Sequence, residues 1–87
     1  MHPARKPSTG WLASEARALD GEIAAAEVVI RAIEAARDAA SAIQQRPGAD
    51  TVAWRLVELG IEDVLTEARA EWTALDGRIT PEIERQL

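Results

Sequence analysis

The chain has 87 residues, of which 47% are hydrophobic, and a formal net charge of −5. This length allows one domain, and the negative charge argues against partners that reward clustered Lys and Arg, namely nucleic acid and anionic membranes. The absence of Cys excludes a disulfide framework and any cysteine-held metal site. Abundant Ala, Glu and Arg, with no Phe or Tyr, favour an all-α fold.

The first residues are expected to form a separate arm. Residues 1–8 contain two prolines and no periodic apolar pattern, so we expect a mobile arm before a helical domain of residues 9–87. Ser8 or Thr9 offers an N-cap for a first helix of about residues 9–46. The start lacks the apolar core of a secretory signal, and no apolar run could span a bilayer, so we expect a cytoplasmic protein without a membrane partner.

The first helix carries one apolar seam. Its positions alternate steps of four and three, with one extra short step near Ile33, much as in a heptad pattern. They are Leu12, Ala16, Leu19, Ile23, Ala26, Ile30, Ile33, Ala36, Ala40 and Ile43. Because many are Ala, a partner helix can approach closely. We expect the helix to run through Gly21 despite a penalty of ~1 kcal/mol; the alternative is a three-helix bundle broken near Asp20.

The second helix supplies the bulky residues that the first lacks. Pro47 and Gly48 mark a turn, and Asp50 or Thr51 caps a helix of about residues 51–76. The expected seam is Trp54, Val57, Ile61, Val64, Leu65, Ala68, Trp72 and Leu75, with Val52, Leu56 and Leu59 beside its start. The short link predicts an antiparallel helical hairpin.

The chain is expected to close with a short helix. Gly77 is predicted to end the second helix in the left-handed conformation, and Thr80 with Pro81 signals a new helix of about residues 81–87. A hairpin this small buries little apolar surface. We therefore expect two copies to assemble into a four-helix arrangement.

Four carboxylates of the second helix are candidate binding residues. They are Glu58, Glu62, Glu67 and Glu71, paired at one-turn spacing. One alternative is that they bind a basic protein surface, as a small regulator or inhibitor of the antitoxin or anti-defence type would. A third alternative is a Mg²⁺-dependent nucleotide hydrolase of the all-α type, because such pairs can share a hard cation. The first helix offers no matching pair, since Glu22 and Glu27 stand five apart.

The start of the first helix is a second candidate surface. At ~1.5 Å per residue the first helix would be about 54 Å long and the second about 39 Å, so the hairpin leaves Trp11 and Leu12 uncovered. Trp is a favoured anchor at protein interfaces. We therefore expect these two residues to be covered either by the last segment of the chain or by another protein.

No motif in the chain predicts catalysis. His2 is the single histidine, and no phosphate loop or nucleophile motif occurs, so we expect no catalytic residue, metal or cofactor. The apolar seams remain as the main functional feature. The sequence predicts a non-enzymatic protein–protein interaction or assembly module that binds itself or another protein.

Overall fold

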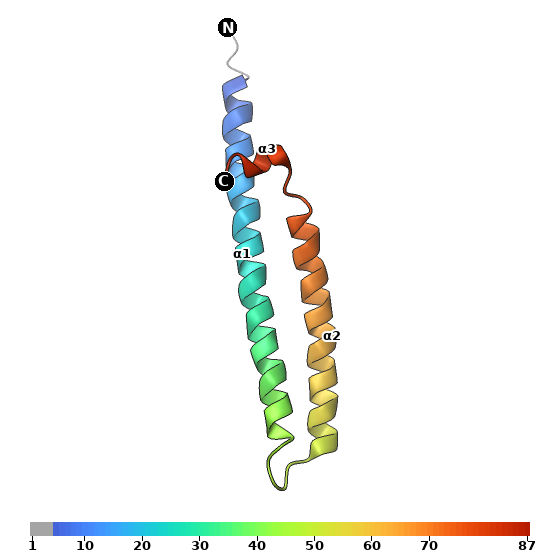
Figure 1. Cartoon of the computed structure of the whole chain (residues 1–87). Coiled ribbons are helices and arrows are strands. Elements are labelled where there is room, and N and C mark those ends of the chain that lie inside the picture. Colours follow the sequence, from blue (N-terminus) through green and yellow to red (C-terminus); the bar gives the residue numbers. More distant parts are fainter. Residues whose placement is uncertain (1–4) are drawn as a thin grey trace.

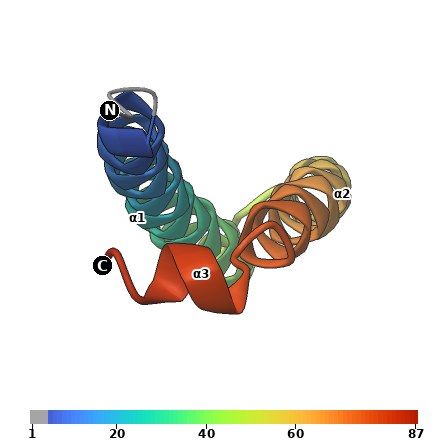
Figure 2. The same cartoon turned by 90° about the horizontal axis from the view of Figure 1, so that it is seen from above.

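The computed structural model describes the backbone of residues 5–87 and the side chains from Leu12 onward. Three helices follow one another: α1 at Arg5–Ile43, α2 at Thr51–Asp76 and α3 at Pro81–Glu84. α1 and α2 lie side by side and antiparallel, and α3 turns back to contact α1 (Figures 1 and 2). The described residues contain no strand, so the expected all-α hairpin with a short C-terminal helix is confirmed. None of the described helices is long and apolar enough to cross a membrane.

The first helix is longer at its start than the sequence indicates. α1 begins at Arg5, so the expected cap at Ser8 or Thr9 is wrong, and of the expected arm only residues 1–4 lie outside the described part. Pro7 falls in the first turn, where a missing backbone N–H leaves no hydrogen bond unmade. α1 also passes unbroken through Gly21. The continuous helix is therefore correct, and the three-helix alternative is not.

The link between the long helices begins earlier than expected. α1 ends at Ile43, three residues before the predicted Arg46, because the next amides bond to carbonyls three residues back. Pro47 disfavours helical geometry at the residue before it, which explains the tighter turn. Gly48 then adopts φ 79°, and it is the only described glycine with positive φ. The chain thus reverses direction within seven residues, which forces the antiparallel pairing.

Side-chain caps fix the starts of α2 and α3. The Asp50 carboxylate accepts a hydrogen bond from the Ala53 amide at 3.0 Å, and the Thr80 hydroxyl accepts one from the Ile83 amide at 3.2 Å. Gly77 ends α2 with φ −66° and ψ −15°, so its predicted left-handed conformation is wrong. Its amide instead bonds to Thr73 O, as a continuing helix would. The reversal towards α1 is made in the residues that follow.

The core lies on the side of α1 that faces α2 and, nearer the start of α1, the C-terminal segment with α3. Its buried apolar residues are Ala16, Leu19, Ile23, Ala40 and Leu65. Ile61, Ala68, Trp72 and Leu75 add half-buried side chains from α2, as predicted. Trp54, Val57 and Val64 do not follow the predicted seam, because all three are exposed, and Glu58 takes an inward position instead. Ala36 of α1 is also exposed.

Candidate functional site

Polar contacts join α1 and α2 along one side of the hairpin. Arg69 Nη2 donates to Glu34 Oε2 at 2.8 Å, and Trp72 Nε1 donates to Glu27 Oε1 at 3.4 Å. Glu27 and Glu34 are seven residues apart and therefore lie on one stripe of α1. One ion pair and one hydrogen bond from a neutral indole therefore bridge the two helices on this side of the hairpin.

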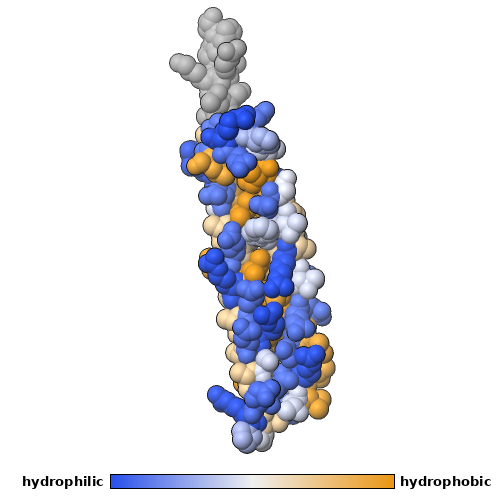
Figure 3. Space-filling model, in the orientation of Figure 1, coloured by the Kyte–Doolittle hydropathy of each residue, from blue (hydrophilic) through white to orange (hydrophobic). Residues whose placement is uncertain are grey.

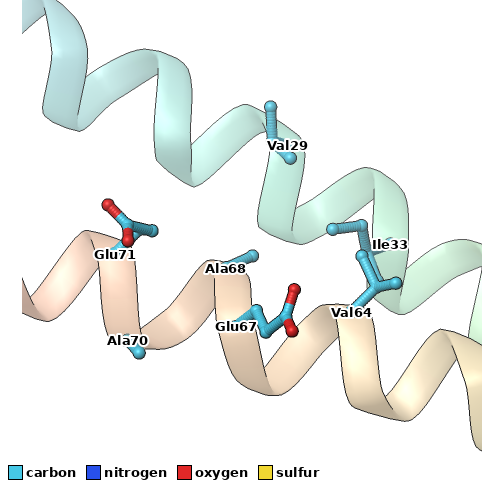
Figure 4. A pocket seen from close by; sticks show the side chains of 7 residues that line it. All are labelled: Val29, Ile33, Val64, Glu67, Ala68, Ala70 and Glu71. Atoms are coloured by element: carbon cyan, nitrogen blue, oxygen red, sulfur yellow. The ribbon is translucent and has the colours of Figure 1, made fainter.

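A shallow apolar groove runs between the helices elsewhere. Val29 and Ile33 of α1 line it with Val64 and Ala68 of α2, around a volume of about 430 Å³. Figure 4 shows the Ile33 and Val64 side chains approaching one another between the ribbons. Ala70, Glu67 and Glu71 complete the lining. The groove is open to solvent and carries no arginine or lysine, so its only charges are negative.

The first half of α2 presents large apolar side chains to solvent. Of the nine large hydrophobic residues exposed in the described part of the chain, five lie in residues 52–59. Val52 and Leu56 are among the most exposed, at 72% and 65%, and Leu59 is 40% exposed. These three residues, which we call the α2 patch, are spaced by four and three and share one face of the helix. Hydrophobic side chains gather at the lower end of α2 in Figure 3.

A second shallow hollow adjoins the α2 patch. Val52 and Leu56 line it with Thr51, Arg55 and Gln44, around about 400 Å³. The sequence named Val52, Leu56 and Leu59 only as neighbours of the seam. The sequence signal for this surface is that the first half of α2 has no polar outer face. A helix that is apolar on all sides is normally buried on all sides.

Glu58 is held inside the hairpin by two donors. Only 9% of the residue is exposed, and its Oε1 accepts hydrogen bonds from Gln44 Nε2 at 3.0 Å and from Arg55 Nη1 at 2.7 Å. These bonds, from Gln44 and then from Arg55, lower the pKa of Glu58, although partial desolvation opposes them. The same contact raises the pKa of Arg55. Glu58 is thus a paired structural carboxylate at the end of the core.

The four predicted carboxylates do not share a face. Glu58 and Glu62 lie towards α1, where the first is buried and the second half-buried. Glu67 and Glu71 are exposed and line the groove. Five residues separate Glu62 from Glu67, which turns them about 140° apart around the helix axis. In the described part of the chain, no three acidic or histidine side chains come close enough together to hold a metal ion.

The other predicted surface is only partly described. The Trp11 side chain lies outside the described residues, whereas Leu12 is half-buried. α1 extends past the point where α3 crosses it (Figure 1). α3 brings half-buried Ile83 towards α1, and Arg78 lies 4.0 Å from Glu22. The last segment therefore covers part of α1 but stops short of its start.

Charge is distributed unevenly along the hairpin. Residues 37–58, which include the link, contain three arginines and three acidic residues, so their net charge is zero. Residues 12–36 and 59–87 contain five arginines and twelve acidic residues, a net charge of −7. The link end is thus neutral and carries the α2 patch, whereas the rest of the chain, including Arg5 and Lys6, carries the whole net charge of −5.

Comparison of the chain with protein-family models, with curated proteins and with solved structures finds no match.

Proposed function

We propose that this protein is a non-enzymatic, cytoplasmic interaction and assembly module that binds protein through the apolar faces of its helical hairpin, with self-association into a four-helix arrangement as its first mode. The observation that carries the proposal is the apolar surface that the hairpin leaves open. Its main parts are the groove and the α2 patch.

The shape of the hairpin shows how much surface stays uncovered. The molecule measures 76 × 15 × 15 Å, with a radius of gyration of 20.1 Å. A compact domain of this length has a radius of gyration of about 12 Å. The accessible surface is 6371 Å² for a mass of 9.4 kDa, against about 5,000 Å² for a compact protein of that mass.

The excess surface is larger than the area that a standard interface buries on one partner. It amounts to roughly 1,400 Å², and a standard protein interface buries about 800 Å² on each partner. The core is correspondingly small, since from Leu12 onward five apolar residues are buried and none of the large side chains is fully enclosed. Association of two hairpins would cover the surface that a single hairpin cannot cover.

Sedimentation tests this proposal. We expect dimers or larger species whose fraction falls on dilution over a roughly hundredfold range of concentration, because association follows mass action. The midpoint of thermal unfolding should rise with concentration for the same reason. A monomer at every concentration, with a melt that does not depend on concentration, would contradict self-association.

The acidic end supports a second candidate function, that of a small regulator or inhibitor binding a basic protein surface. A net charge of −5 outside residues 37–58 attracts such a partner over about 10 Å at ~0.1 M salt. Immobilised protein should then retain a basic protein from a cell lysate and release it as salt rises. Replacing Glu67 and Glu71 by Gln should weaken retention and leave helicity unchanged.

The matched control for that experiment changes the same number of charges elsewhere. Glu82→Gln with Glu84→Gln removes two exposed carboxylates from α3. Equal loss in both double variants would indicate attraction by net charge alone. Retention that neither salt nor Glu67→Gln with Glu71→Gln changes would remove the acidic surface as a binding site.

A further inference from the structure

One stretch of α2 has the composition of a helix that is covered on every side. Residues 52–61 contain two charged side chains, Arg55 and Glu58. These two pair with one another at 2.7 Å, and Gln44 bonds the same carboxylate from the α1 side. No charge remains on the opposite side of the stretch. Since α1 lies along one side only, the other side of this stretch lacks a cover.

The uncovered side is a continuous apolar face. The α2 patch provides Val52, Leu56 and Leu59, and Val57 is exposed beside it. Gly60 lies one turn from Leu56, and nothing lies within 4 Å of the position that a Cβ would take there. An interior helix glycine costs ~1 kcal/mol relative to alanine. No contact within the hairpin requires glycine at position 60. A second helix that crosses close to α2 would require it, because a side chain there would keep the two helices apart.

The charge distribution selects the orientation of a partner copy. In a parallel pair the two acidic ends would lie together, and like charges would face one another. In an antiparallel pair that overlaps at the link ends, the neutral segments of residues 37–58 meet and the two acidic ends point away from each other. Only the second arrangement joins the apolar faces without that repulsion.

We propose that a second copy of this chain docks on the α2 patch, with the two α2 helices antiparallel and the two Leu56 side chains meeting near the twofold axis. This inference rests on the proposed assembly function and names its partner and contact face. In this register Val52 lies opposite Gly60 of the second copy, where a missing side chain permits close approach. Asp63 falls opposite residue 49, beyond the start of the facing α2 and therefore at the edge of the contact.

Matched glutamate substitutions test the face. Leu56 is 65% exposed and Val28 of α1 is 63% exposed, so neither change removes core packing. Leu56→Glu places two carboxylates at the axis and should raise the dimer dissociation constant by at least about tenfold. Val28→Glu adds the same charge away from α2 and should leave the constant unchanged. Circular dichroism should show equal helicity in both variants.

Cysteine crosslinking tests the orientation, because the chain has no cysteine of its own. Leu56→Cys should form an intermolecular disulfide under mild oxidation, since residues at a twofold axis meet their own copies. Ala70→Cys lies two heptads further along the exposed side of α2 and should not crosslink. In the antiparallel pair the two Ala70 positions are about 42 Å apart; in a parallel pair they would be neighbours.

The outcomes separate this inference from the proposed function. A wild-type dimer that Leu56→Glu leaves intact overturns the α2 face but keeps assembly. Crosslinking of both cysteine variants overturns the antiparallel orientation. A wild-type protein that stays monomeric at every concentration overturns this inference and self-association. Binding of a different protein through Leu56 would then keep the interaction module but still overturn the second copy as its partner. Weakening by Leu56→Glu alone, with crosslinking of Leu56→Cys alone, supports the inference.

Discussion

We expect Leu65→Ala to lower the free energy of unfolding by about 2–4 kcal/mol, the usual cost of removing a buried leucine side chain. Leu65 is 2% exposed and is the one apolar residue of α2 that counts as buried. Few neighbours can fill the space that the leucine side chain leaves. Many seam residues of α1 are alanines, which are too short to reach it, and the others already pack at their own seam positions. Urea unfolding followed by circular dichroism measures the effect.

Leu56→Ala provides the control, since it removes the same atoms from a side chain that is 65% exposed. At a concentration where sedimentation shows monomers, this change should alter stability by less than about 0.5 kcal/mol. Equal losses in the two variants would mean that the α2 face described as the core is not the one that holds the hairpin together. A loss in Leu65→Ala alone assigns the stability to the facing seams.

The helices and their order were largely predictable because the signals for them are local. Asp50 caps the start of α2 and Gly77 follows its last residue, as the sequence indicates. Pro47 and Gly48 place the turn, and the short link leaves only the antiparallel orientation. The start of α1 was not predictable from Ser8 or Thr9, because a helix can begin before a capping residue when its first turn tolerates proline.

The inward face of α2 was only partly predictable. Apolarity alone favours Val57 and Val64, which the structure leaves exposed, over Glu58. The charged residue is accepted inside because Gln44 reaches its carboxylate from the link and Arg55 from the preceding turn. A contact between residues 14 positions apart depends on the folded turn, so no pattern within α2 could reveal it.

The same shift changes the candidate site. Because Glu58 points inward, Val57 and Val64 are exposed. They add to the apolar surface that Leu56 and Leu59 present to solvent on α2. The sequence identified the acidic residues instead, because charge follows directly from residue type, whereas exposure depends on how the helices pack. The structure separates Glu58 and Glu62 from Glu67 and Glu71, whose role as a binding pair stays a prediction.

Two glycines should respond oppositely to the same substitution. Gly48 adopts φ 79° in the link, a conformation that an L-residue resists, so Gly48→Ala should lower the free energy of unfolding by about 1 kcal/mol. Nothing lies within 4 Å of a Cβ at this position, so the loss would arise from the backbone rather than from a clash. Gly48→Asn, which tolerates this conformation better, should recover part of the stability.

Gly21→Ala should instead raise the free energy of unfolding by up to about 1 kcal/mol, because alanine is the better residue in a helix interior. Gly21 lies within the unbroken α1, and a Cβ there also meets nothing within 4 Å. Urea melts of the two alanine variants, compared at one protein concentration, measure both effects. If Gly21→Ala destabilised the protein while sedimentation showed weaker association, a partner helix would pack against its bare Cα. That result would place the contact between copies on α1 instead of on the α2 patch.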